Sequence, residues 1–411
     1  MSNTKTSPII DLIRNGQWKA VQKKIEGTKS TLDSTRMKKF DSSMEGALFQ
    51  ALKARAPKYI IELIADLDNF EHAILFKDPR SKSTPLHIAV RRHSSVASLL
   101  LKKADRISSS LREKLLSAID RNGMNPIHVA LTFGSSFQTI RTMLQNLSTE
   151  WKCSNLNIPT TQRKSPLYLA CECLKTTSDT LSFLLDQGAT YENEESPSGN
   201  WKPLHVLACP RSFSLRSESG RDERKEMIAT LVQKFPEACF ETTDSGLTPI
   251  ALFFSDLHEC ADVYDYEADG QKDIVRLLLG LKTNNAFGDD EVSNHVQSKE
   301  CKIGVVHKAL CLPQYVPGLM EFLLEHFPKD CQIFHKGDLP LHHAIRRKAS
   351  SNNALITKHE FNCIKNKFPK AVRIQELHSG GFPFMVAASL SLVETTFDLL
   401  RFSPDVIMRA A

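Results

Sequence analysis

The sequence STPLHIAV, residues 83–90, decides the fold of this chain. Thr84 can cap the start of a helix, and Pro85 suits the first helical position, where the N–H that proline lacks would have no helical partner anyway. Leu86 and Ala89 then fall on one helical face, and the small Ala89 lets a second helix approach closely. The stretch therefore predicts a helix that begins at Pro85 and packs against a neighbouring helix.

Related versions of this phrase recur along the whole chain. Their first helical residues, a Pro or its substitute, are Pro8, Ala47, Pro85, Pro126, Pro166, Pro203, Pro249, Val305, Pro340 and Pro383. A further apolar helical segment follows each of them. Units of this kind bury their apolar faces against their neighbours, so ten of them predict a stacked solenoid with one continuous core.

A turn residue also recurs, three positions before the first helix of a unit. Gly123, Gly246, Gly337 and Gly380 occupy this position, and Asn200 takes the same place in another unit. Gly and Asn are the residues that a left-handed backbone conformation favours. We therefore expect the connectors to form the same hairpin-like turn from unit to unit.

The phrase TPLHIA at residues 84–89 resembles the T-P-L-H-x-A signature of ankyrin repeats, and the resemblance extends over nearly the whole chain from Ser7. It implies an all-α solenoid of stacked helix-turn-helix units with hairpin-like connecting loops. Residues 1–43 are expected to form an N-terminal helical capping unit with a connector, and residues 44–411 the divergent, lengthened repeats. The extra residues are expected mostly between the two helices of a unit, with insertions near 209–224, 254–270 and 281–301.

The same resemblance implies function. Ankyrin repeats are non-enzymatic binding modules that present turn tips and first helices as an extended concave surface, so we expect a scaffold for one or more protein partners. The register predicts that the following turn residues contact a partner: Arg121, Asn122, Met124, Arg163, Lys164, Asn200, Trp201, Ser245, Leu247, Lys336 and Asp338. Trp201 could equally be a binding anchor or pack on the neighbouring turn.

Two alternative functions remain open at this point. Residues 338–374 contain eight Lys or Arg and only two acidic residues, a balance that could attract nucleic acid or another anionic surface. No base-stacking aromatic motif accompanies them, which favours a solvated helix face and disfavours nucleic acid as the partner. A role as the substrate adaptor subunit of an enzyme complex is the second alternative.

The sequence contains no recognised catalytic motif, and we expect neither enzymatic activity nor a cofactor. The histidines in the repeated phrase occur one per unit, which favours structural roles over a shared metal ion; they are His87, His128, His205, His307 and His342. Residues 265–270 copy the start of a calcium loop, but Arg276 occupies the twelfth place, where a bidentate Glu is needed. No metal site is therefore predicted.

Composition places the chain among soluble intracellular proteins. Its net charge is +6, its ten Cys include no C-x-x-C pair, and no segment resembles a signal peptide or a membrane span. A cytoplasmic location is expected, with a nuclear one also open. Ser94 and Ser350 follow Arg-rich stretches typical of basophilic kinase sites, although each could simply cap a second helix.

Overall fold

The computed structural model describes residues 8–29, 46–67, 70–92, 94–191, 199–209, 218–245, 247–253, 268–278, 304–310, 319–349, 356–377 and 379–410. Helices dominate these residues, whose only extended pairing is an isolated bridge between His335 and Asp338. This confirms the predicted all-α class. Contacts divide the chain into two units, Met1–Pro197 and Ser198–Ala411, which are described separately.

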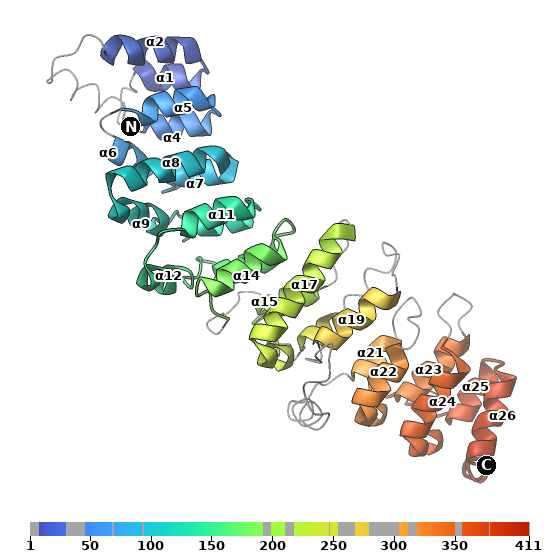
Figure 1. The fold of residues 1–411 in the computed structure, drawn as a ribbon. Coiled ribbons are helices and arrows are strands. Elements are labelled where there is room, and N and C mark those ends of the chain that lie inside the picture. Colours follow the sequence, from blue (N-terminus) through green and yellow to red (C-terminus); the bar gives the residue numbers. More distant parts are fainter. Residues whose placement is uncertain are drawn as a thin grey trace. The chain divides into compact units, whose positions relative to one another are not determined.

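The first unit consists of helix pairs stacked in chain order (Figure 1). The pairs are α1 (Pro8–Arg14) with α2 (Trp18–Lys29), α4 (Ala47–Lys53) with α5 (Lys58–Ala65), α7 (Pro85–Arg92) with α8 (Ser94–Ile107), α10 (Pro126–Thr132) with α11 (Phe137–Leu144), and α13 (Pro166–Glu172) with α14 (Ser178–Asp186). The first member of each pair contacts the first member of the next. The N-terminal pair stacks on α4 and α5 in the same way.

The extra length of these repeats lies after the second helix. A third short helix follows α5, α8 and α11 in turn, namely α6 (Phe70–Leu75), α9 (Ser109–Ser117) and α12 (Thr149–Asn155). Between α7 and α8, by contrast, only one residue intervenes. The sequence-based expectation that extra residues separate the two helices of a unit is therefore wrong for these repeats.

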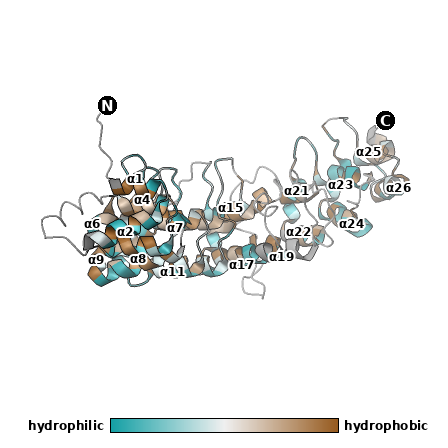
Figure 2. Ribbon diagram, turned by 90° about the horizontal axis from the view of Figure 1, so that it is seen from above, coloured by the Kyte–Doolittle hydropathy of each residue, from teal (hydrophilic) through white to brown (hydrophobic). Residues whose placement is uncertain are grey.

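In the second unit, Figure 2 shows first helices in one row and second helices in another. The first helices are α15 (Pro203–Ala208), α21 (Val305–Leu310), α23 (Pro340–Ala349) and α25 (Pro383–Ser389), and residues 249–253 are also helical. The second helices are α17 (Glu218–Lys234), α19 (Ala268–Leu278), α22 (Leu319–His326), α24 (Lys358–Lys367) and α26 (Val393–Phe402), with α27 (Val406–Ala410) at the end. The 3-10 helices η1 (Pro236–Phe240), η2 (Pro328–Gln332) and η3 (Pro369–Arg373) each begin at a Pro that follows a Phe.

Parts of the three predicted insertions lie outside the described residues. These parts are residues 210–217, 254–267 and the whole of 281–301. The described ends of the first two insertions are helical, because α17 begins at Glu218 and α19 at Ala268.

Most first helices begin at a Pro, as the repeated phrase predicts, and in several of them a polar side chain just before the Pro caps the helix. The side chain of Asn125 accepts hydrogen bonds from the backbone N–H groups of Ile127 and His128, each at 3.0 Å. Ser165 caps α13 by the same means. Helix α21 begins at Val305 instead of a Pro, and the carboxylate of Asp330 from the following 3-10 helix accepts the N–H of Val306 at 3.3 Å.

Close packing of the first helices depends on a small residue at their fifth position. This residue is fully buried in six of them: Ala51, Ala89, Ala130, Ala170, Ala344 and Ala387. Leu86, Leu167 and Leu341 fill the core beside it. An Ala at this point leaves space for the second helix, as the sequence predicts, so each repeat contributes one layer to its unit's core.

The turns before the first helices use the predicted left-handed residue. Gly123, Gly337, Gly380 and Asn200 have φ of 70°, 89°, 66° and 59°, while Gly246 lies outside the described residues. Two residues at the same position do not look like turn residues in the sequence. They are Lys82 and Arg163, with φ of 55° and 57°.

Neighbouring turns are joined by backbone hydrogen bonds at their tips. Arg121 donates its N–H to the carbonyl of Ser81 at 2.8 Å, and Thr161 donates to Asn122 at 3.0 Å. This close approach leaves no space beside the left-handed residue. A Cβ built on Gly123 would lie 2.9 Å from the backbone nitrogen of Thr161.

We predict that Gly123→Ala destabilises the protein more than Gly380→Ala. Both residues have almost the same φ, so both variants incur the left-handed penalty of about 1 kcal/mol. Only at Gly123 does the new methyl group also meet backbone, since nothing lies within 4 Å of a Cβ at Gly380. Urea unfolding followed by circular dichroism should show a loss of at least about 2 kcal/mol for Gly123→Ala. Equal losses would contradict the tight turn-to-turn contact.

Candidate interaction surface

Five of the turns are tied to the preceding repeat by a buried histidine. In His87 the ring Nδ1 accepts the backbone N–H of Thr84 at 3.1 Å, and Nε2 lies 2.9 Å from the carbonyl oxygen of Met124 in the next turn. A nitrogen that accepts an N–H carries no proton of its own, so the ring is the neutral tautomer with its proton on Nε2. His87 therefore donates to Met124 and sets the position of the following turn.

The same two hydrogen bonds recur in both units. His128 accepts from Asn125 and contacts the carbonyl of Ile158, while His342 accepts from Leu339 and contacts that of Ile374. His205 accepts from Lys202 and lies 3.2 Å from the carbonyls of Glu241 and Leu247. Each ring thus joins the start of its own first helix to the next turn.

His307 keeps only half of this arrangement. Its Nε2 lies 2.7 Å from the carbonyl of Ile333, but its Nδ1 is buried without a hydrogen-bond partner. The first helix of this repeat lacks Pro and is capped by Asp330 from a different element. Among the described residues, no group of three or more His, Cys, Asp or Glu is arranged to hold a metal ion.

Burial keeps these imidazoles neutral. It lowers the pKa of His128, His205 and His307 from 6.5 to about 4, although the backbone carbonyls that they contact raise it in part. Burial lowers the pKa of His87 and His342 as well. A proton on Nδ1 would also displace the backbone N–H that this nitrogen accepts.

We define the turn surface as the hairpin turns together with the seventh residue of each first helix. Arg121, Asn122, Arg163, Ser245 and Lys336 are exposed there, whereas Met124, Lys164, Asn200, Trp201 and Leu247 are half-buried. The side chain of Trp201 is therefore neither fully exposed nor fully packed. Sequence reasoning placed the turn tips but omitted Arg80 and Lys82, which are exposed in the turn before α7.

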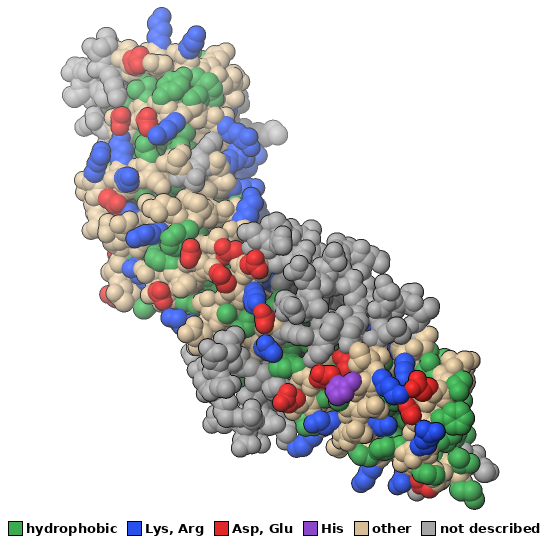
Figure 3. Space-filling model, turned by 45° about the vertical axis from the view of Figure 1, so that its right-hand side comes forward, with side chains coloured by type: hydrophobic (Ala, Val, Ile, Leu, Met, Phe, Trp, Pro, Cys, Tyr) green, Lys and Arg blue, Asp and Glu red, His purple; other side chains and the backbone are tan. Residues whose placement is uncertain are grey.

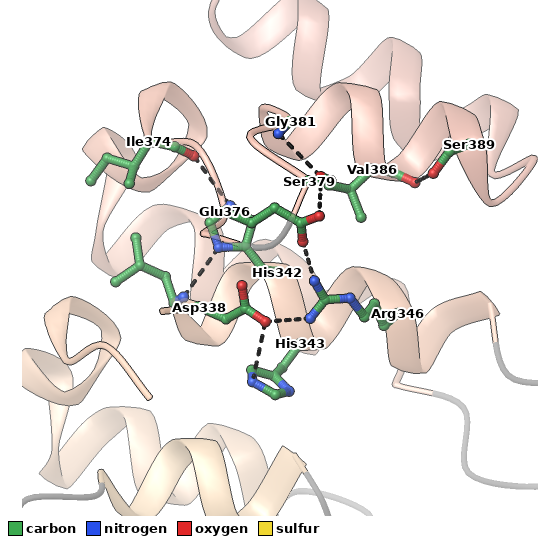
Figure 4. A network of polar contacts seen from close by, with 11 residues as sticks. Asp338, His342, His343, Arg346, Ile374, Glu376, Ser379, Gly381, Val386 and Ser389 are labelled. Atoms are coloured by element: carbon green, nitrogen blue, oxygen red, sulfur yellow. Dashed lines mark hydrogen bonds and ion pairs between the residues drawn. The ribbon is translucent and has the colours of Figure 1, made fainter. Parts of the chain in front are cut away.

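The seventh residue of the first helix contacts the turn of its own repeat. Lys164 forms an ion pair with Glu172 at 2.6 Å in the first unit. At the same two positions in the second unit, Asp338 pairs with Arg346, so the charges are reversed. Arg346 also reaches Glu376 in the next turn (Figure 4).

The prediction that Asp338 offers its side chain to a partner is wrong. Asp338 is 3% exposed, its carboxylate is bound by Arg346, and His343 Nε2 lies 3.9 Å from it. The sequence alone did not indicate this, because the pairing requires the first helix to bring its seventh residue back over the turn.

The basic stretch at 338–374 does not form one uniform basic face. Lys358 pairs with Glu394, Arg373 with Asp405, and Arg346 with the two acids already named. Lys348 donates to Thr395, and Lys365 is buried over the ring of Phe402. Most of these cations therefore form ion pairs, hydrogen bonds or ring contacts with other residues of the second unit.

Several remaining predictions fall on residues that the structure does not describe. Ser350 and residues 265–267 of the calcium-loop resemblance lie outside the described residues, and so does the side chain of Ser94, the first residue of α8. Cys331 is buried, which raises the pKa of its thiol to about 12 and makes it a poor nucleophile. No helix in the described ranges has the length and apolar character needed to cross a membrane.

Comparison with known proteins identifies the repeat. The ankyrin repeat family model matches residues 81–109, which span one hairpin turn, α7 and α8. Residues 81–109 are an ankyrin repeat. The histidine contacts of His128, His205 and His342 repeat the geometry of His87 and extend the ankyrin arrangement along both units.

The crystal structure of the ankyrin repeat domain of Bcl-3, described as a unique member of the IκB protein family, is similar to this chain at 17% sequence identity and a TM-score of 0.41. The match covers 67% of this chain and 98% of that domain. No curated protein sequence matches the chain.

We predict that stability falls as the pH drops below about 6.5. The native pKa of His128, His205 and His307 is about 4, whereas an unfolded histidine titrates near 6.5, so only the unfolded state gains these protons between the two values. Each of the three should cost about 2 kcal/mol of stability at pH 5 relative to pH 7.5. Urea midpoints at the two pH values measure this loss.

The variant His128→Gln is the control for that titration. It should be less stable than the parent at pH 7.5 but lose less stability between pH 7.5 and pH 5, because one titrating ring is gone. A parent midpoint that does not move with pH would contradict the neutral histidines.

A second prediction concerns the reversed ion pairs. Arg346→Ala leaves the carboxylates of Asp338 and Glu376 buried without their cation and should cost about 3 kcal/mol at neutral pH. The matched variant Lys164→Ala frees only Glu172, whose side chain is 45% exposed, and should cost less than about 1 kcal/mol. Similar losses in urea unfolding would show that Arg346 does not hold the turn.

Proposed function

We propose that this chain binds another protein through its turn surface and acts as a non-enzymatic scaffold. Ankyrin repeats generally mediate protein–protein interaction, and the turn geometry supports the same role here. The observation that carries the proposal is the fixed turn backbone with exposed side chains. Asn122, for example, is exposed while its backbone N–H and carbonyl are both hydrogen-bonded, to Asp120 and Thr161.

Such a surface suits recognition because the entropy cost of ordering the turn backbone is met during folding and not during binding. The histidines and the tip-to-tip hydrogen bonds hold the turns before any partner arrives, so binding loses little backbone entropy. The exposed side chains differ from one turn to the next, which supplies specificity. The described cysteines form no disulfide, and this supports a location in a reducing compartment of the cell.

Site-specific photo-crosslinking of the full chain in nuclease-treated cell extract tests the proposal. A photoreactive residue replaces Asn122 on the turn surface or, as the matched control, the exposed Lys102 on α8. We expect discrete protein adducts from position 122 and none from position 102. Equal labelling from both positions, or no adduct from either, would overturn the proposed surface. Adducts that appear only when nuclease is omitted would instead indicate nucleic acid as the partner.

A further inference from the structure

Lysine and arginine occupy strained backbone positions in this chain. Among the described residues, seven non-glycine residues have positive φ, and four of them are Arg55, Lys82, Arg163 and Lys336. Lys82 and Arg163 hold the same turn position that Gly123 fills between them. A residue with a Cβ incurs an energetic penalty there that glycine avoids. For Lys82, the local stability of the turn backbone therefore does not explain the cation.

The acidic residues of the same turns accept hydrogen bonds from residues of their own turn. Asp78 accepts the N–H and the hydroxyl of Ser81, both at 2.9 Å, and Asp120 accepts the N–H groups of Asn122 and Met124 at 2.8 and 2.9 Å. These hydrogen bonds build the turns and hold both carboxylates close to the backbone.

Most cations of these turns, in contrast, face solvent, the exception being Lys164, which is half-buried and pairs with Glu172. The turn segments 77–83, 119–124 and 158–164 contain six Lys or Arg and only the two Asp residues already described. Lys77, Arg80, Lys82 and Arg121 are exposed. Like charges gathered in this way repel one another, which again does not favour folding.

The first helices add cationic groups to the same surface. Lys53 and Arg91 are seventh residues of α4 and α7, and both are exposed. The guanidinium of Arg91 lies 4.4 Å from the centre of the Phe133 ring, which is itself 42% exposed. Lys and Arg side chains are prominent on the first unit in Figure 3.

The turns of the second unit carry more acidic residues than those of the first unit. Its turns carry Asp244, Asp338 and Glu376, and its seventh-position Arg346 is bound by two of these acids. The excess of exposed cations is therefore a property of the first unit's turn surface and not of the repeat architecture in general.

We propose that the turn surface of the first unit binds an acidic segment of a partner protein. This inference rests on the proposed function and adds the chemistry of the partner. Carboxylates placed across two successive turns would pair with Arg80, Lys82 and Arg121, and an apolar side chain would contact Phe133. A single exposed aromatic ring provides no stacking row for bases, so the surface favours a peptide over nucleic acid.

The test uses the full chain and a fluorescein-labelled deca-glutamate peptide, with anisotropy measured at low ionic strength. The double variant Lys82→Gly/Arg163→Gly removes two cations and relieves two left-handed residues. We expect the peptide to bind about fivefold to tenfold more weakly to this variant, while the melting temperature stays the same or rises. Weaker binding by an equally or more stable protein cannot result from unfolding.

The control variant Lys102→Gln/Lys114→Gln removes the same charge from exposed positions on α8 and α9 and should change binding by less than about twofold. Binding by the parent should also fall as salt rises. Equal weakening by both double variants, or none by the turn variant, would overturn the inference. Tighter binding of a single-stranded decanucleotide than of the peptide would overturn it in favour of nucleic acid. Protein adducts from position 122 without peptide binding would leave the interaction surface standing and refute only the acidic partner.

Discussion

The hydrogen bonds of a neutral, buried imidazole determine how successive ankyrin repeats join in this protein. In His87, His128, His205 and His342, Nδ1 accepts the N–H at the start of the ring's own first helix, and Nε2 donates to a carbonyl in the next turn. Because both nitrogens are used, the ring fixes the next turn in distance and in direction. Stacking of the fully buried Ala residues below completes the link between repeats.

Much of the turn surface depends on that link. The tips form backbone hydrogen bonds with each other only because the turns are held in register, and the seventh residues of the first helices meet turn residues at fixed positions. The same pair of positions holds Lys164 with Glu172 in one unit and Asp338 with Arg346 in the other. One backbone geometry thus supports opposite charge patterns, and this is how a repeat can keep its fold while its surface changes.

The sequence was sufficient to predict the repeat, its helix starts and most of its turns. These depend on neighbours in the chain, such as the Pro behind a cap and the Ala four residues later, and local patterns report local constraints. Gly123 and Asn200 identified their left-handed positions, but Lys82 and Arg163 did not, since neither residue type prefers that conformation.

Contacts between distant residues could not be predicted in this way. Asp330 caps a helix 25 residues earlier that lacks its Pro, and Asp338 is buried because Arg346 folds back over the turn. Nothing in the local sequence of Asp338 distinguishes it from an exposed turn acid such as Asp244. The third helices α6, α9 and α12 were missed because they are short, at 6, 9 and 7 residues, and so short a segment shows little helical periodicity.

Nitrogen-15 NMR of the histidine rings tests the central claim most directly. At pH 7 the rings of His87, His128, His205 and His342 should each show a protonated Nε2 and an unprotonated Nδ1, with no averaging between tautomers. For His128 and His205 this pattern should persist down to about pH 5. Averaged tautomers, or imidazolium signals that appear near pH 6.5, would contradict the account, because such rings could not hold successive repeats together.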